Sequence, residues 1–384
     1  MSGNGTARAG DVAEFVAGLP LIDHHCHGVR TGAIADAEFE LLASESDWPA
    51  PPGTSVFDNP FGIAVRALCA PLLDLPAHCT GEDYLKRRGE LGDAEVSARL
   101  LSASGTERYL LDTGFSASTV MTPPAMAQLT GAVTEEIVRL ESLAESIAPG
   151  CTAAGFANSF EDALGSALEQ AVGVKSIIAY RYGLDFDPAP PTYGEVTAAA
   201  GRWLAGIESG APVRLTDPVL LRHLLWRAVG FGKPIQLHVG FGDPDIVLHR
   251  CDPSHLTGFA HATRETGAQL MLLHCYPYIR EAGILAHLFP HVWMDTSLAV
   301  SHTGPSAETM VRQSLEIAPL HKVLYASDAF GLPELYLCGA QLWRRAVGRI
   351  LTEWLTENLA GKTDIHRYAE LLGRGNALRA YGLE

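Results

Sequence analysis

The hydrophobic pattern of the chain repeats one unit many times: a short apolar run, a polar turn, and then a longer stretch with helical spacing. Eight apolar runs are predicted strands, because runs of this length bounded by turn residues are typical of parallel strands covered on both faces. They are residues 20–23, 109–112, 137–140, 174–180, 235–238, 269–274, 292–295 and 323–327.

Helical patterns fill the intervals between these strands. Residues 160–172, 333–359 and 364–380 carry apolar residues at helical spacing, and residues 218–229 follow Asp217, a suitable N-cap before a proline. Eight strands alternating with helices predict the α/β class and a closed (β/α)8 TIM barrel. An open doubly wound sheet is the alternative, but no GxGxxG loop follows any predicted strand.

One connection is too long for a barrel loop. Residues 28–104 separate the first predicted strand from the second, whereas strand-to-helix loops usually have a few residues. They contain Pro-rich turns and predicted helices near 35–46, 61–70 and 97–102. We expect residues 1–384 to form a single barrel domain in which 28–104 is an inserted helical cap over the mouth. A separate small domain is the alternative.

Histidines gather at the end of the first predicted strand, in the sequence His24-His25-Cys26-His27. Alternate residues of a strand share a face, so we expect His25 and His27 to point one way and His24 and Cys26 the other. Two imidazoles on one face can bind a divalent metal together. A chance polar turn is the simpler interpretation, but buried imidazoles at this density would need several hydrogen-bond partners.

Three further predicted strands end in the same way. His238, His274 and Asp328 end or directly follow the fifth, sixth and eighth strands. In a barrel the catalytic groups come from the carboxyl ends of different strands, so we expect these residues to meet the histidines of the first strand at one mouth. The other histidines lie in predicted helices or loops, where packing or surface roles are favoured. Among these, only His302, in the loop after the seventh strand, could also reach the mouth.

Composition and charge restrict the classes of function. The 28 Lys and Arg against 44 Asp and Glu give a net charge of −16, which repels phosphate backbones and anionic lipids. No apolar run approaches the roughly 18–20 residues of a membrane span, and the first residues lack the apolar core of a signal peptide. The seven cysteines form no CxxC pair and indicate reduced thiols. We therefore expect a cytoplasmic protein that acts on a small molecule and binds neither nucleic acid nor membrane. Such barrels often form homo-oligomers, but no interface is specified.

These residues together resemble the amidohydrolase superfamily of metal-dependent hydrolases. Residues 375–381 look like the terminal helix of the amidohydrolase-2 branch, and the long cap, segment 174–181 and segment 236–243 are similar to FluG-type amidohydrolase domains. The resemblance rests above all on five residues in a fixed chain order: His25, His27, His238, His274 and Asp328.

The resemblance implies a metal site. His25, His27 and His238 would be metal ligands, and Asp328 would complete the site. His274 would be either a ligand of a second metal or an acid that polarises the substrate carbonyl.

The expected number of metals depends on the fourth strand, where binuclear relatives carry a carboxylated lysine at the carboxyl end. Lys175 is the only lysine in the predicted strand 174–180. About five strand residues follow it, which would place it more than about 10 Å below the mouth. We therefore expect Lys175 at the bottom of the barrel and a single divalent metal, Zn²⁺, in the site.

The resemblance also implies a mechanism. A divalent metal lowers the pKa of bound water from about 15.7 to about 7. Asp328 would accept the proton and pass it to the leaving group, while His274 would stabilise the developing oxyanion. The expected reaction is hydrolysis of a C–N bond in an amide or a related group. The alternatives are a non-oxidative decarboxylase with the same ligands, a non-catalytic metal-binding scaffold and, more distantly, a sugar-acid isomerase.

The substrate is only weakly encoded. Arg181, at the end of the fourth predicted strand, could pair with a substrate carboxylate, although a rim ion pair with Glu141 or Asp185 is an equal alternative. Glu141 and Asp243 are two further candidates for substrate contacts. By analogy with FluG-type domains, we expect a small carboxylate-bearing amide such as a γ-glutamyl amide.

Overall fold

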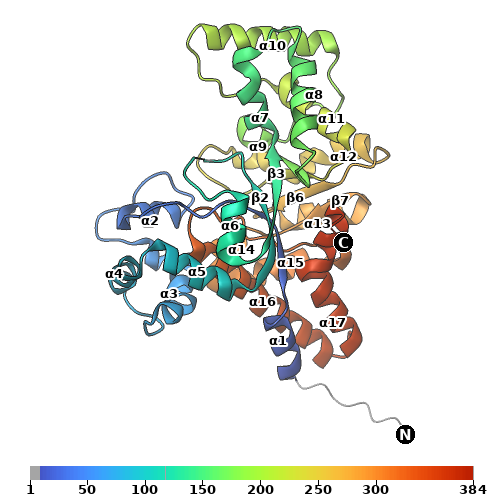
Figure 1. The fold of residues 1–384 in the computed structure, drawn as a ribbon. Coiled ribbons are helices and arrows are strands. Elements are labelled where there is room, and N and C mark those ends of the chain that lie inside the picture. Colours follow the sequence, from blue (N-terminus) through green and yellow to red (C-terminus); the bar gives the residue numbers. More distant parts are fainter. Residues whose placement is uncertain (1–8, 117, 384) are drawn as a thin grey trace.

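Seven parallel strands curl into a barrel surrounded by helices in the computed structural model (Figure 1). The structure describes residues 9–116 and 118–383. Each strand pairs with the next along the chain, so the order in the sheet follows the sequence. The strands are β1 (Leu21–Cys26), β2 (Thr106–Asp112), β3 (Val133–Arg139), β4 (Gly173–Ser176), β5 (Ile235–Val239), β6 (Leu270–His274) and β7 (Val292–Met294).

Residues 323–328 close the barrel in the place of an eighth strand. The N–H of Leu324 donates to the carbonyl of Met294 on β7 at 2.9 Å. On the other side, the N–H of Asp328 donates to the carbonyl of His25 on β1 at 3.0 Å. The segment makes too few bonds to count as a regular strand, but it joins β7 to β1. The predicted α/β barrel is confirmed.

Strand β4 ends earlier than its apolar pattern predicts. The apolar run over 174–180 continues past Ser176 because the next element, α9 (Ile178–Arg181), is a single helical turn that begins with buried apolar residues. Periodicity does not separate a buried strand from a buried turn of this length. Lys175 therefore lies at the carboxyl end of β4, and the prediction that it lies at the bottom of the barrel is wrong.

Helices cover the outside of the barrel. Within residues 9–116 and 118–383, no helix has both the length and the apolar character needed to cross a bilayer. The helices are α1 (Ala9–Ala17), α2 (Asp36–Leu42), α3 (Pro60–Leu68), α4 (Gly81–Leu91), α5 (Asp93–Ser104), α6 (Pro123–Thr130), α7 (Leu140–Ile147), α8 (Phe156–Ala167), α9 (Ile178–Arg181), α10 (Tyr193–Glu208), α11 (Pro218–Phe231), α12 (Thr257–Thr263), α13 (Ile279–Leu288), α14 (Ala299–His302), α15 (Ala307–Ser314), α16 (Pro333–Thr356), α17 (Lys362–Glu370) and α18 (Asn376–Tyr381).

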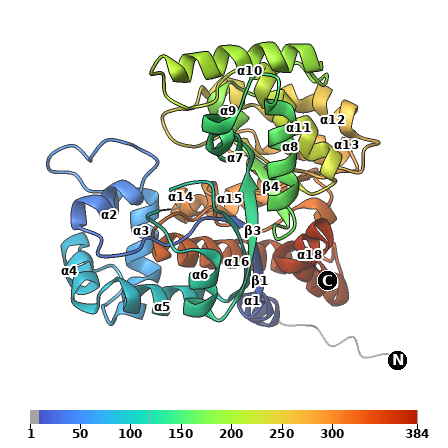
Figure 2. The ribbon, with the colours of Figure 1, turned by 45° about the horizontal axis from the view of Figure 1, so that its top comes forward.

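Two groups of helices extend beyond the barrel (Figure 2). Helices α7, α8, α10 and α11 form one group, and α2 to α5, inserted between β1 and β2, form the other. The inserted group is tied to α16 by a buried ion pair of 2.9 Å between Arg88 and Glu334. That residues 28–104 act as a distinct cap subdomain of one domain stays a prediction.

The interior of the barrel is filled by apolar side chains and closed by α18. Ile22 of β1 belongs to the same buried cluster as Tyr381 of α18, whereas Cys26 packs in the outer core, as expected. The register of β1 against β2 shifts between Asp23 and Cys26, so strict alternation fails there. Ile22 and His24 both face the interior, where His24 Nδ1 lies 3.0 Å from the Tyr381 hydroxyl, and the shift lets the next residue, His25, face the interior as well. The expectation that His24 faces away from the barrel interior is wrong.

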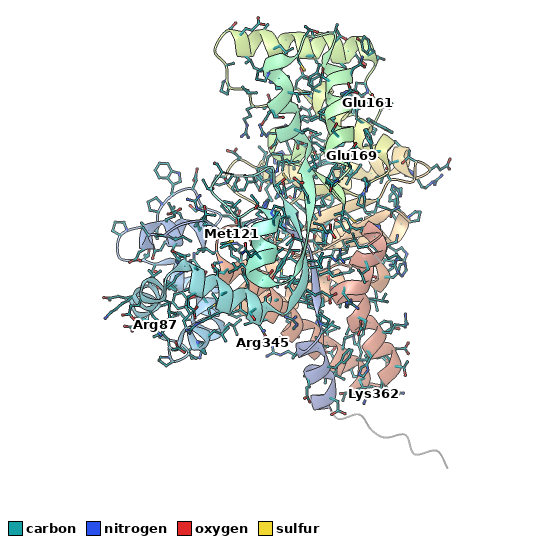
Figure 3. All side chains as sticks on the ribbon, viewed as in Figure 1. Arg87, Met121, Glu161, Glu169, Arg345 and Lys362 are labelled. Carbon is teal, nitrogen blue, oxygen red and sulfur yellow. The ribbon has the colours of Figure 1, made fainter. Side chains whose placement is uncertain are left out.

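Arg344 of α16 joins the loops at the amino ends of β1 and β2, and its replacement tests this arrangement. The buried guanidinium donates to the carbonyls of Leu19, Ser104 and Gly105. We expect Arg344→Met to lower the free energy of unfolding by about 3 kcal/mol, because three carbonyls lose a charged donor. Urea unfolding measures this change. The neighbouring Arg345, which is exposed (Figure 3), provides the control Arg345→Met. Equal stability of the two variants would contradict the prediction.

Candidate metal centre

A cavity of about 470 Å³ opens at the carboxyl ends of the strands. Its wall contains all five residues predicted for the metal site, together with one residue predicted elsewhere. These six lining residues are His25 and His27 at the end of β1, Lys175 on β4, His238 on β5, His274 on β6 and Asp328 in the closing segment.

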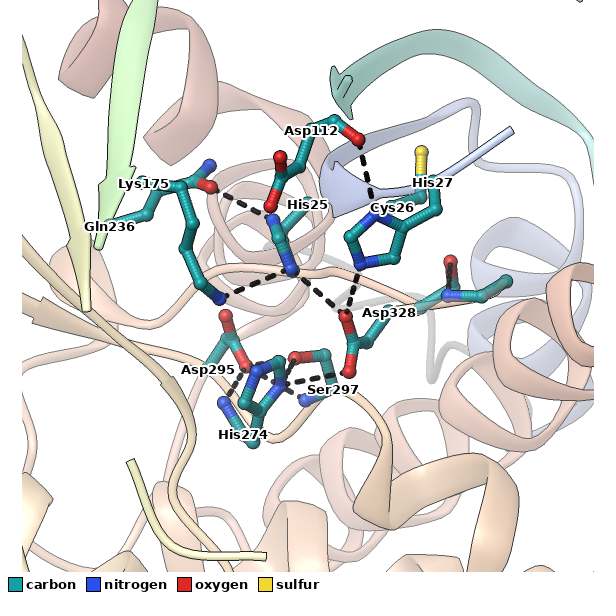
Figure 4. A network of polar contacts seen from close by, with 12 residues as sticks. His25, Cys26, His27, Asp112, Lys175, Gln236, His274, Asp295, Ser297 and Asp328 are labelled. Atoms are coloured by element: carbon teal, nitrogen blue, oxygen red, sulfur yellow. Dashed lines mark hydrogen bonds and ion pairs between the residues drawn. The ribbon is translucent and has the colours of Figure 1, made fainter. Parts of the chain in front are cut away.

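Asp328 is the centre of the site, and three imidazoles approach its carboxylate (Figure 4). Oδ1 lies 2.9 Å from His25 Nε2 and 3.6 Å from His27 Nε2. Oδ2 lies 3.4 Å from His274 Nδ1. One ligand atom from each of His25, His27 and Asp328 falls within 4.8 Å of the others. Two imidazoles and a carboxylate at this spacing are a donor set that suits a divalent metal such as Zn²⁺.

Each imidazole of the β1 end is oriented by a hydrogen bond at its other nitrogen. His25 Nδ1 lies 2.8 Å from Gln236 Oε1, and His27 Nδ1 lies 3.1 Å from the carbonyl of Asp112. Both partners are acceptors, so each Nδ1 carries the proton and each Nε2 presents a lone pair toward Asp328. This is the tautomer that a metal ligand requires.

The loop that carries Asp328 is fixed by Asp23 of β1. Asp23 Oδ1 accepts the N–H of Ser327 at 2.9 Å, and Oδ2 accepts the Ser327 hydroxyl at 2.5 Å. Asp328 itself has a φ of 53°, a left-handed conformation that is uncommon outside Gly, Asn and Asp. The carboxylate is therefore held in one position by both side-chain and backbone constraints.

His274 is positioned by two residues that follow β7. Its backbone N–H donates to Asp295 Oδ1 at 2.8 Å, and its Nδ1 lies 2.8 Å from Ser297 Oγ. The Ser297 hydroxyl donates in turn to Asp295 Oδ1 at 2.6 Å, which leaves Ser297 Oγ free to accept from the imidazole. Asp295 Oδ2 also binds His24 Nε2 at 2.8 Å. Asp295 and Ser297 thus act on the site through His274.

His238 shows that the site suits a further ligand. The side chain is buried, and its Nε2 has no hydrogen-bond partner among the described residues. Its ring lies 4.3 Å from the Tyr180 ring and 4.5 Å from the His274 ring. A buried imidazole nitrogen without a partner raises the free energy of the folded state, and a metal ion would satisfy it. The donor set therefore fits a divalent metal.

Burial sets the protonation states of these groups. It lowers the pKa of His25 to about 4 and holds the pKa values of His238 and His274 well below their ordinary value. Burial alone would raise the pKa of Asp328, but the neighbouring imidazoles hold that pKa well below its usual range. At neutral pH the site thus presents neutral imidazoles and an ionised carboxylate, the forms that bind a metal.

Lys175 belongs to the same centre. The side chain is buried, and its Nζ lies 3.3 Å from His25 Nε2 (Figure 4). Burial lowers the pKa of Lys175 to about 8, so part of the population is a neutral amine near neutral pH. The expectation of a single metal depended on Lys175 lying at the bottom of the barrel, and the observed position removes that basis.

Two of the three predicted substrate contacts line the cavity. Arg181 does so with its Nη1 3.0 Å from Glu145 Oε1, an ion pair with a different glutamate from the one expected. The Nε of Arg181 is buried and has no hydrogen-bond partner among residues 9–116 and 118–383. Asp243 lines the cavity as well, and burial raises the pKa of its carboxyl.

Glu141, the third, lies in another place. It is not among the residues that line this cavity. As the second residue of α7, it is buried, and its Oε1 accepts the Ser176 hydroxyl at 2.6 Å and the Ile177 N–H at 3.0 Å. Glu141 therefore holds the end of β4, two residues from Lys175.

Sequence reasoning missed two basic residues of the cavity wall. Arg139, the last residue of β3, lines the cavity and binds Asp112 Oδ2 through Nη2 at 2.6 Å. Arg214 lines it from the connection before α11 and pairs with Asp245 at 2.9 Å. The strand-end rule that located the histidines could have identified Arg139. No comparable signal exists for Arg214, because a long loop has no register.

The pH dependence of stability tests the burial of Lys175. The unfolded chain keeps this lysine protonated up to its ordinary pKa of 10.5, whereas the folded chain releases the proton near pH 8. The unfolded state thus binds more protons between these values, and the Lys175 contribution to the free energy of unfolding rises with pH. We subtract the free energy of unfolding of Lys175→Met from that of the wild type, both treated with chelator. We expect this difference to rise by about 1.4 kcal/mol per pH unit across this window.

Urea unfolding at several pH values measures that difference. Lys362→Met is the control, because Lys362 lies half exposed on α17 (Figure 3). Parallel pH curves for wild type and Lys175→Met would contradict the prediction.

Comparison with known sequences gives two matches. The profile of the amidohydrolase family Amidohydro_2 matches residues 196–383. Over 375 residues, the chain is 26% identical to Protein fluG of Emericella nidulans. That match covers 88% of this chain and 42% of FluG, so the chain spans less than half the length of this relative.

Comparison with solved structures extends the likeness to the whole fold. A candidate metal-dependent hydrolase from Lactobacillus casei is 26% identical, with a TM-score of 0.83 and 97% of each chain covered. A glucuronate isomerase from Caulobacter crescentus has a TM-score of 0.67 at 13% identity, with 100% of this chain and 96% of that chain covered, which shows a shared fold alone. The resemblance drawn from the sequence is confirmed: residues 196–383 match the amidohydrolase family profile, and the chain is similar to FluG over most of its length.

Proposed function

We propose that the chain is a metal-dependent hydrolase that cleaves the C–N bond of a small, carboxylate-bearing amide. One observation supports this above all: four imidazoles, a carboxylate and a lysine from four strand ends and the closing segment converge on one cavity. A barrel that only needed to be stable would gain nothing from burying so many polar groups together.

His25, His27, His238 and Asp328 would hold the metal, and Zn²⁺ is the ion that three imidazoles and a carboxylate suit best. When bound there, a divalent metal supplies Lewis acidity and lowers the pKa of water. Lys175 lies beside His25 at the carboxyl end of β4, where binuclear relatives carry a carboxylated lysine. The proposal therefore includes a second metal ion, which Lys175 would help to hold.

The chain's own groups would move the protons. The Asp328 carboxylate is ionised and fixed, so it can accept a proton from the attacking water and deliver it to the leaving nitrogen. His274, held by Asp295 and Ser297, is neutral and donates its Nδ1 proton to Ser297 Oγ, so its Nε2 offers a lone pair and would hold the second metal rather than donate to the carbonyl. Water supplies hydroxyl to the acyl carbon and hydrogen to the nitrogen, and the products are a carboxylic acid and an amine.

Arg181 would bind the substrate carboxylate. Its guanidinium lies in the cavity wall with a buried Nε that lacks a partner, and Glu145 occupies only one side of it. A planar guanidinium suits a carboxylate better than any other basic group. Asp243, in the loop after the neighbouring strand β5, is proposed as a second substrate contact, and such a role for Glu141 stays a prediction.

Replacement of Asp328 tests the reaction. We expect Asp328→Asn to lower kcat by at least about 10²-fold, because an amide cannot accept the proton. The other proposed ligands remain, so metal should largely be retained. The assay measures amine release from small N-acyl and γ-glutamyl amides, with metal content by mass spectrometry, which also counts one or two ions in the wild type.

The control is His287→Ala, at an exposed histidine of α13. Wild-type turnover in Asp328→Asn would refute the proposed role of this carboxylate. Release of CO₂ without amine from a carboxylate-bearing substrate would favour the decarboxylase alternative.

Replacement of Arg181 tests the substrate class. We expect Arg181→Gln to raise KM for a carboxylate-bearing amide roughly 10- to 100-fold with little change in kcat, because a charge-assisted hydrogen bond to the substrate is lost. The corresponding neutral carboxamide should be unaffected. Arg312→Gln is the control, since Arg312 of α15 also pairs with glutamates but does not line the cavity. An equal effect on both substrates would contradict the assignment.

A further inference from the structure

The walls of the cavity differ in chemical character around the barrel. The guanidinium groups of Arg139 and Arg181 lie on the side of β3 and β4. The β2 loop, the residue Phe330 just after the closing segment, α2 and α16 contribute apolar side chains to the lining: Leu41, Leu42, Phe115, Phe330 and Leu335. In an eight-position barrel, β4 and the closing segment lie half a turn apart, so Arg181 faces Phe330 across the metal centre, whereas Arg139 borders the apolar wall at Phe115.

Two aromatic rings form the centre of the apolar wall. The rings of Phe115 and Phe330 lie 4.8 Å apart at an angle of 54°. Both are close to the His27 ring, with centroid distances of 5.6 Å and 5.9 Å. An apolar group of the substrate that contacted these rings would therefore be separated from His27, a proposed metal ligand, by a single aromatic ring.

Phe115 is unusual because it remains open to the cavity. The residue is 39% exposed and lines the cavity together with buried groups. The Arg139 guanidinium lies 5.2 Å from the centre of its ring, and that guanidinium is itself held by Asp112. The Arg139 guanidinium contacts the Phe115 ring while it is paired with Asp112. The exposed surface of the ring is therefore available to an uncharged group of a ligand.

We propose that Phe115 and Phe330 form a subsite for an aromatic group of the substrate, on the opposite side of the scissile amide from the carboxylate that Arg181 binds. Aromatic rings favour offset or edge-to-face contacts at the separations seen here, so a third ring would extend an existing pair. This inference rests on the proposed hydrolase function, and it defines the substrate class as an aryl-bearing amide with a carboxylate at its other end.

Binding of two matched amides to the metal-loaded protein tests the subsite. Hippurate and N-acetylglycine share the amide and the carboxylate, and only hippurate carries a phenyl ring. We expect calorimetry to show hippurate binding about 10-fold more tightly, as expected for burial of one ring against two others. Phe115→Ala and Phe330→Ala should each lose most of this preference and leave the affinity for N-acetylglycine and the metal content unchanged.

Two further variants keep the test decisive. Phe115→Leu retains an apolar side chain, so it should fold if Phe115→Ala does not, and it should still weaken hippurate selectively. Phe231→Ala is the matched control, because Phe231 at the end of α11 is 38% exposed and does not line the cavity. Its preference should be unchanged.

Equal affinity for both amides when both rings are present would overturn the proposal. So would an equal loss of both affinities in the Phe115 variants, because that result would mean that the ring only supports His27. All titrations use the Asp328→Asn background, which should retain metal and cleave neither amide, so the affinities do not depend on turnover. If hippurate is preferred but the wild type cleaves no amide, the hydrolase proposal fails while the aromatic subsite stands.

Discussion

The buried carboxylate of Asp328, at the seam where the barrel closes, is the constraint on which the rest of the structure depends. A buried carboxylate is costly unless donors or cations surround it, and here three imidazoles do so. Those imidazoles reach it only because residues 323–328 lie between β7 and β1. The segment that closes the barrel therefore also assembles the site.

The residues behind the imidazoles follow from that constraint. A ring that must direct one nitrogen at Asp328 needs its other nitrogen bound, and Gln236 provides this for His25. Close packing also constrains the loop after β5, beside His238. A Cβ at Gly242 would lie 2.0 Å from the Tyr180 hydroxyl and 3.0 Å from His238 Nε2, so only glycine leaves room beside this imidazole. The site is rigid because its supports are themselves buried and bonded.

The sequence was sufficient to predict the positions of the seven strands and the five strand-end residues, because both depend on local pattern. It was insufficient where tertiary structure overrides that pattern. The register shift in β1 brought two consecutive residues, His24 and His25, to the interior, and nothing in the alternation of side chains signals a shift of this kind. Glu141 looked like a rim residue, but α7 begins at Leu140 and carries it behind β4. Arg214 comes from a loop whose path no periodicity encodes.

The early end of β4 connects the main error of sequence reasoning to the chemistry. If the strand had continued to residue 180, Lys175 would lie deep in the barrel. Instead the strand stops at Ser176, and Glu141 holds the turn that follows. Lys175 thereby reaches the floor of the cavity, and the single turn of α9 places Arg181 in the wall above it. One short strand and one helical turn thus supply a group for the metal centre and a group for the substrate, which a longer regular strand could not do.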